Sequence, residues 1–155
     1  MEQIEKIIKD LQKFLKKVDE KVDKFARDMN DLVNLIQQIV ENEIGRSKRA
    51  VMREVEKIDR KLRKYQAEAQ KWVDDQLAEI QRWLNDQIQK AKDQIKRQTA
   101  KEKLSVMECA TKQKIPESMV DSLLKVIPDP PVPVPPVPTT IKIELPTYTL
   151  PTNLL

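Results

Sequence analysis

The residue types that carry most enzyme chemistry are scarce in this chain. It has no histidine, so it lacks the commonest general base and the commonest metal ligand. Cys109 is its only cysteine, which excludes an intrachain disulfide and a thiolate metal cluster. A thiol can link two chains, but we interpret Cys109 as a small buried apolar residue. The sequence also has no glycine-rich phosphate loop and no Gly-x-Ser-x-Gly motif. We therefore expect a protein that is not an enzyme and that uses no cofactor or metal ion.

Basic side chains are the second group with the chemistry to bind a ligand. Residues 46–115 carry nineteen basic and eleven acidic side chains, a net charge of +8. A basic helix can bind phosphate groups with an affinity that falls as the salt concentration rises. Acidic residues are interleaved with the basic ones, however, and opposite charges three or four residues apart mainly stabilise the helix itself. We favour a solvated, self-paired face over a nucleic-acid site for the densest basic run, which comprises Arg46, Lys48, Arg49, Arg53, Lys57, Arg60, Lys61, Arg63 and Lys64.

The elements that carry these side chains follow from the distribution of glycine and proline. Residues 1–115 contain one glycine and no proline, whereas residues 116–155 contain all ten prolines. Glycine and proline are the strongest breakers of regular structure. The predicted fold class is therefore all-α, with a long coiled-coil-like helix followed by an extended proline-rich arm that holds a lone β-strand.

Apolar residues recur in heptads over residues 1–39. Sustained heptads indicate a coiled coil, so we predict an oligomer seam in this segment. Ile7, Phe14 and Leu35 widen the apolar stripe beyond a two-stranded seam, which favours a trimer or a larger homo-oligomer. An amphipathic helix in an ordinary bundle is the alternative. After Met1, the seam comprises Ile4, Ile8, Leu11, Leu15, Val18, Val22, Phe25, Met29, Leu32, Ile36 and Ile39.

Gly45 is the one weak point in the helical region, and it has two interpretations. In the left-handed conformation it would end one helix, with Ser47 capping the next and the chain folding into a hairpin. Alternatively, the helix runs through it at a cost of about 1 kcal/mol. The apolar stripe resumes on the same spacing without a proline, and we therefore favour a continuous or slightly bent helix.

The apolar period changes to eleven residues further along. The sequence Trp-Val-Asp-Asp-Gln-Leu of residues 72–77 returns as Trp-Leu-Asn-Asp-Gln-Ile in residues 83–88. Eleven residues make nearly three turns, so the repeat places its apolar residues on one straight strip. The strip resembles the eleven-residue helical repeats of some lipid-surface and virion stalk proteins. This hendecad face comprises Trp72, Val73, Leu77, Ile80, Trp83, Leu84, Ile88 and Ile95.

The chain divides into five predicted parts. Residues 1–44 form the heptad segment and residues 45–115 the basic and hendecad segment. Residues 116–127 form a short docking helix, residues 128–138 a polyproline II spacer, and residues 139–155 the C-terminal arm. Residues 139–145 alternate apolar and polar side chains, as a strand does, and a lone strand must pair with another chain. The predicted arm-docking residues are Ile141, Ile143, Leu145, Tyr148 and Leu150.

These patterns favour a non-enzymatic structural or assembly protein, whose rod oligomerises and whose arm docks on other structural proteins. A phage or virus particle is the setting we favour, as a tail, collar, fibre-attachment or minor capsid protein. One alternative is a membrane-surface protein that uses the hendecad face, and another is a nucleic-acid-binding or scaffolding coiled coil. The N-terminus lacks the apolar run of a signal peptide, so we expect the virion or the cytoplasm of the producing cell, without export by a cleaved signal.

Overall fold

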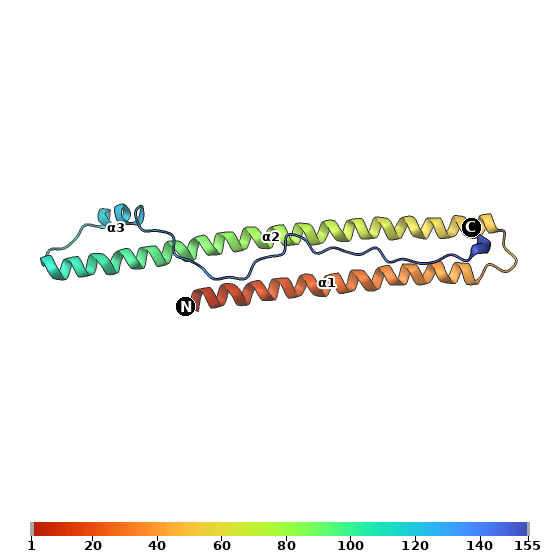
Figure 1. Cartoon of the computed structure of the whole chain (residues 1–155), viewed down its shortest axis with the longest axis horizontal. Helices are drawn as coiled ribbons and strands as arrows, with labels where there is room; N and C mark the ends of the chain where they lie inside the picture. Colours follow the sequence, from red (N-terminus) through yellow and green to blue (C-terminus); the bar gives the residue numbers. More distant parts are fainter. Residues whose placement is uncertain (1, 155) are drawn as a thin grey trace. The chain divides into compact units, whose positions relative to one another are not determined.

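The structure is mostly helical, as the scarcity of glycine and proline predicts. The computed structural model describes residues 2–154, apart from the side chain of Asn153, and leaves Met1 and Leu155 outside the description. No β-strand is present within residues 2–154. The helices are α1 (Glu2–Glu41), α2 (Lys48–Thr111) and α3 (Glu117–Leu124), with a final 3₁₀ turn, η1 (Thr152–Leu154) (Figure 1).

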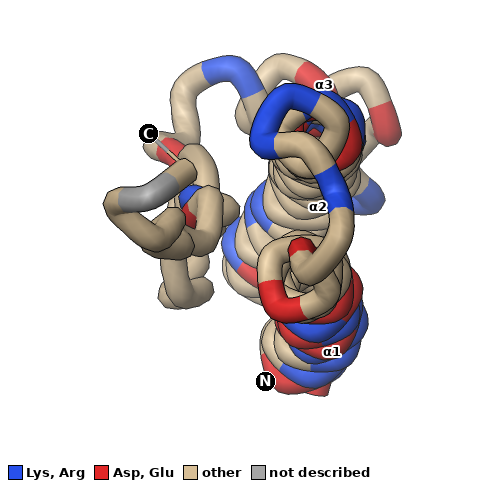
Figure 2. The backbone as a smooth tube through the Cα atoms, turned by 90° about the vertical axis from the view of Figure 1, so that its right-hand side faces the viewer, with Lys and Arg blue, Asp and Glu red and all other residues tan. Residues whose placement is uncertain are grey.

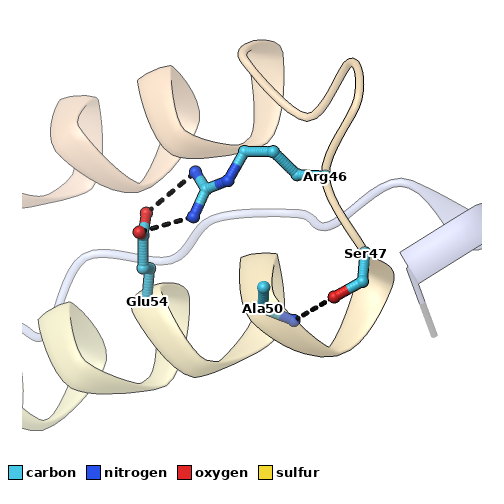
Figure 3. Close-up of polar contacts among 4 residues, drawn as sticks. All are labelled: Arg46, Ser47, Ala50 and Glu54. Atoms are coloured by element: carbon cyan, nitrogen blue, oxygen red, sulfur yellow. Dashed lines mark hydrogen bonds and ion pairs between the residues drawn. The ribbon is translucent and has the colours of Figure 1, made fainter.

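The chain turns back between α1 and α2, so the continuous helix favoured from the sequence is wrong. Gly45 has a φ of +79°, in the left-handed region that glycine adopts without strain. The hydroxyl oxygen of Ser47 accepts a hydrogen bond of 3.1 Å from the backbone N–H of Ala50, which caps the start of α2 (Figure 3). The local signals for a hairpin were therefore present, and the hairpin alternative at Gly45 is confirmed.

An ion pair joins the turn to the first part of α2. The guanidinium of Arg46 donates to both carboxylate oxygens of Glu54, one of the bonds being 3.1 Å long (Figure 3). The bond from Arg46 lowers the pKa of the Glu54 carboxyl below its ordinary value. Both side chains are in contact with solvent, so the pair orients the turn and adds little stability.

The chain forms two compact units. One combines the start of α1, up to Gln12, with residues 80–136. The other combines residues 13–79 with the chain from residue 137 onward. The C-terminal arm thus belongs to a different unit from residues 128–136 of the proline-rich segment.

In the unit containing residues 13–79, the hairpin and the arm share one apolar cluster. Ile36 of α1, Val51 and Val55 of α2, and Leu154 of the arm are all buried in it. Leu154, which is 5% exposed, closes the cluster from the C-terminal end of the chain. The cluster is completed by the partly buried side chains of Ile39, Val40, Met52, Ile58, Tyr148 and Leu150.

In the unit containing residues 80–136, α3 packs back on the end of α2. Val120 of α3 is buried against Ala100 and Leu104, and Ile115, Leu123, Leu124 and Ile127 surround them. Lys112, with a φ of 54°, ends α2. An ion pair of 2.7 Å between Lys96 and Asp129 holds the first part of the proline-rich segment, and it lowers the pKa of the Asp129 carboxyl.

The predicted seam of α1 faces inward in both units. Five seam residues are buried, Ile4, Leu11, Val18, Met29 and Ile36, and the remaining six, Ile8, Leu15, Val22, Phe25, Leu32 and Ile39, are half-buried. At Phe25 and Ile36 the covering side chains come from the same chain. Charges of both signs lie along the rest of α1 (Figure 2). A role of this seam between chains stays a prediction.

The hendecad face also faces inward. Val73, Leu77, Ile80 and Leu84 are buried, while Trp72, Trp83, Ile88 and Ile95 are half-buried. Within residues 2–154, no helix is both long enough and apolar enough to cross a membrane.

The strand predicted at residues 139–145 does not form. This segment contains no helix and no strand, and neither does the proline-rich segment 128–138. A β-strand needs the backbone of another strand as its partner. Here the backbone of the arm meets the side chains of α2 instead, and these contacts form the candidate functional site.

Candidate functional site: the arm-binding face of α2

Four polar residues of α2 hold the arm, and we name them the arm-binding face. They are Asp59, Gln66, Gln70 and Asp74, spaced by seven, four and four residues. Such spacings bring side chains to one face of a helix. The arm, residues 139–155, lies along this face from Thr140 to Tyr148 (Figure 1).

Gln70 makes the central contact, because its amide bonds the arm backbone on both sides of Lys142. Its Oε1 accepts a hydrogen bond of 2.7 Å from the N–H of Ile143. Its Nε2 donates one of 3.0 Å to the carbonyl of Ile141. In a parallel β-ladder, a residue of one strand bonds the carbonyl and the N–H that flank a residue of the next. The Gln70 side chain therefore takes the place of one residue of a neighbouring strand.

Gln66 and Asp74 extend this contact by one helical turn in each direction. Gln66 Nε2 donates a hydrogen bond of 2.8 Å to the carbonyl of Ile143. The hydroxyl of Thr140 donates one of 2.7 Å to Asp74 Oδ1. Gln70 Nε2 also bonds Asp74 Oδ1, at 3.1 Å, which orients the glutamine amide. Three successive turns of α2 thus fix the register of residues 140–143.

The arm is extended and runs antiparallel to α2. Thr140 bonds Asp74, and Tyr148 bonds Asp59. The fifteen residue steps of α2 from Asp59 to Asp74 span roughly 22 Å at 1.5 Å per residue. Eight arm residues cover the same length, at roughly 2.8 Å each, close to the rise of an extended chain. An extended conformation is thus present although a strand is not.

Tyr148 and Asp59 form the second polar contact of the arm. The Tyr148 hydroxyl donates a hydrogen bond of 2.7 Å to Asp59 Oδ1, and Arg63 Nε donates one of 2.9 Å to the other carboxylate oxygen. The bond from Tyr148 is the main cause of the lowered pKa of Asp59, with Arg63 adding to it. Burial and the bond to Asp59 raise the pKa of Tyr148 to about 12. The pair is thus held with the carboxyl ionised and the phenol protonated.

Apolar side chains anchor the arm on either side of these bonds. Ile143 is 3% exposed and therefore almost fully removed from water. The other predicted docking residues, Ile141, Leu145, Tyr148 and Leu150, are half-buried. These residues contact the chain's own hairpin, and docking on a separate protein stays a prediction.

The four residues of the arm-binding face were not predicted from the sequence. The only signal for them was the spacing of Gln66, Gln70 and Asp74 at four-residue intervals along one helix face. That spacing is common on solvated helices, where glutamine bonds its own helix. Gln81 does so, bonding Asn85 at 2.8 Å. Only the position of the arm distinguishes Gln70 from Gln81.

A cluster of three aromatic residues lies next to this face. Phe25 of α1 meets Tyr65 and Trp72 of α2 edge-on, with ring centroids 5.9 Å and 5.6 Å apart. Lys21 Nζ lies 5.8 Å from the centroids of the Phe25 and Trp72 rings, within the range of a cation–π contact. Trp72, part of the hendecad face that the membrane-surface alternative would use, is engaged here in contacts between α1 and α2.

Asp28 ties this cluster to α1 by a polar contact. The Tyr65 hydroxyl donates a hydrogen bond of 2.6 Å to Asp28 Oδ2. Burial, followed by this bond, raises the pKa of Tyr65 to about 12. The closed face of the hairpin and its arm-binding face are therefore formed by neighbouring residues of α2, Tyr65 and Gln66.

The other sequence candidates lie apart from this site. Cys109 is exposed, so its interpretation as a buried apolar residue is wrong; it lies near the end of α2, where polar residues outnumber apolar ones. All nine residues of the basic run are exposed, and within it Arg46 pairs with Glu54 and Arg63 with Asp59. No group of acidic or cysteine side chains with the geometry of a metal site occurs in the described part of the chain.

Comparison with known proteins adds no family to this description. No protein-family model, no curated protein and no solved structure matches the chain.

Proposed function

We propose that the chain is a non-enzymatic structural component of a larger assembly, with a phage or virus particle as the setting. The helical hairpin is the rod, and the arm is the segment that attaches chains to one another. The observation that carries this proposal is the hold of Gln70 on Ile141 and Ile143. A segment without secondary structure is kept in one register by side chains of a helix, which suits a part that fastens and positions.

Exposed apolar side chains support contacts with further chains. Leu35, on the widened stripe of α1, is 43% exposed, and Ile44 in the turn is 92% exposed. Near the end of α2 and beyond it, Val106 and Val126 are 70% and 73% exposed. Large apolar side chains that are exposed in this way are available for contact with further chains. We propose copies of the same chain and other structural proteins as the partners.

The proposal is tested by following the full-length chain in the cells that produce it. Ile143→Asp places a charge in a site that is 3% exposed and should release the arm. We expect the wild-type chain to sediment with particles and the variant to sediment free. Thr149→Asp adds the same charge at an exposed arm position and serves as the matched control. A wild-type chain that sediments free of any particle would contradict the proposal.

A nucleic-acid-binding coiled coil is the second candidate, because the basic run is exposed throughout. Its test is the salt dependence described in the Discussion. The membrane-surface alternative has less support, since Val73, Leu77, Ile80 and Leu84 of the hendecad face are buried.

A further inference from the structure

The arm behaves as a ligand of the hairpin. Within residues 139–154 the only backbone-to-backbone hydrogen bond runs from Leu154 to Pro151. Its other main-chain contacts go to Gln66 and Gln70. A segment with so few bonds of its own takes its conformation from the surface to which it binds. The arm-binding face therefore recognises an extended peptide.

The arm-binding face contacts features that every copy of the arm carries. Gln70 bonds main-chain groups on both sides of Lys142, and Asp74 accepts from the hydroxyl of Thr140. Ile143 fills an apolar site, and Tyr148 reaches Asp59. Nothing in these contacts requires that the arm and the face belong to the same chain.

The segment that connects the arm-binding face to the arm also suits exchange of the arm between copies of the chain. The chain leaves the arm-binding face within α2, passes through the unit containing residues 80–136, and returns at residue 137 to the unit containing residues 13–79. The last part of this connection, residues 128–138, contains seven prolines. A proline-rich linker is stiff, so it limits how readily an arm finds its own face. Exchange of an identical segment between copies preserves every contact at low cost.

We propose that the arm-binding face of one copy binds the arm of a second copy, through Gln66, Gln70 and Asp74 on α2 and residues 140–143 of the arm. Exchanged arms link the chains of the assembly, and an arm folded on its own hairpin is the unlinked form. The inference deepens the proposed function and rests on it. At low concentration the intrachain contact prevails, and crowding of copies in an assembly favours exchange.

The test traps the exchanged arm with a disulfide between two full-length chains, both carrying Cys109→Ala. The first chain carries Asp74→Cys and Ile143→Asp, so it has an open face and no functional arm. The second carries Thr140→Cys and Gln70→Ala, so it has a functional arm and a weakened face. The Thr140 hydroxyl and Asp74 carboxylate lie 2.7 Å apart, so cysteines at these two positions would be neighbours when the arm is bound. We expect a mixed dimer on oxidation, at least tenfold more abundant than with Asp75→Cys in place of Asp74→Cys.

Two further measurements make each outcome informative. A single chain with both Asp74→Cys and Thr140→Cys should form the intrachain bond at low concentration. If it does so while the mixed pair gives no dimer above the Asp75→Cys control, exchange is ruled out and the arm contact remains.

The second measurement is for the case in which Ile143→Asp or Gln70→Ala unfolds its chain, as shown by loss of helical circular dichroism. Two chains that carry only Asp74→Cys and Thr140→Cys besides Cys109→Ala, one of the two cysteines each, are then mixed and oxidised. Their mixed dimer should increase with chain concentration, and a yield independent of concentration contradicts exchange. Sedimentation with particles is measured separately, so a failure of the proposed function is distinguishable.

Discussion

The phenol of Tyr148 donates a 2.7 Å hydrogen bond to the carboxylate of Asp59, which lies 89 residues earlier in the chain. This bond joins the arm to α2 at a point where Asp59 also pairs with Arg63. It fixes the protonation state of both partners, since the pKa of Asp59 is lowered and that of Tyr148 is raised to about 12. The stability of the docked arm therefore depends on pH at the acidic and the alkaline ends of the range.

We predict that this contact is stable across the neutral range and is lost at both ends. The Asp59 contribution is present above the ordinary carboxyl pKa of 3.8 and disappears as the pH falls through the lower folded value. The Tyr148 contribution is complete below pH 10.0 and disappears as the pH rises toward about 12. The measurement is the difference in unfolding free energy between wild type and Tyr148→Phe, expected to be about 1 kcal/mol at neutral pH. A difference that stays constant over the whole range would contradict the assignment.

Gln70→Ala should destabilise the docked arm by about 1–2 kcal/mol, because it leaves the N–H of Ile143 without its acceptor. Chemical unfolding measures the loss, and amide hydrogen exchange at Ile143 locates it. Gln81→Ala is the matched control, since Gln81 bonds Asn85 on its own helix. The control should change stability by less than about 0.5 kcal/mol. Equal effects of the two substitutions would show that Gln70 has no special role.

Gly45→Ala should destabilise the hairpin by about 1–2 kcal/mol, measured by thermal unfolding, because a residue with a Cβ is strained at a φ of +79°. An added Cβ would meet no atom within 4 Å beyond its chain neighbours, so the cost comes from the local backbone conformation and not from packing against the rest of the protein. Gly45→Asn is the control and should cost less, since asparagine tolerates the left-handed region. If alanine proves as stable as glycine, the turn has a different backbone in solution.

The nucleic-acid alternative is tested directly by measuring DNA binding by the basic run. If residues 46–64 bind duplex DNA, affinity should fall steeply with salt, roughly in proportion to the number of phosphates contacted. Arg49→Gln with Arg53→Gln should then reduce the salt slope by about two. Both residues are exposed, so the double variant should keep its fold. An affinity that does not change with salt removes this candidate.

The sequence predicted the high helical content because that follows from local composition. Gly45, Pro116 and Pro128 each lie a few residues beyond the end of a helix, and the heptads predicted which side of α1 faces inward, as the burial of Leu11 and Ile36 illustrates. The hairpin was missed because Gly45 permits either a turn or a helix. The choice depends on distant contacts that cover the stripe, such as those of Phe25 with Tyr65 and Trp72.

The alternation of Ile141, Ile143 and Leu145 predicted extended chain but could not identify its partner. Alternation shows which side chains share a face. It is expected equally for a β-strand and for an extended segment that lies along a helix. The partner is a glutamine amide, and the sequence does not distinguish Gln70 from glutamines that bond their own helix. Long-range polar contacts of this kind become visible only when the fold is known.

The two fixed points of the arm define a length. Ile143 is bonded by Gln70 and Tyr148 by Asp59, so the four residues between them, 144–147, must bridge a set distance along α2. A deletion within these four residues should break either the Ile143–Gln70 or the Tyr148–Asp59 contact, and an insertion should force the chain between them to loop out. The number of residues in this interval is therefore fixed by the structure, and the interval tolerates changes of side chain more readily than changes of length.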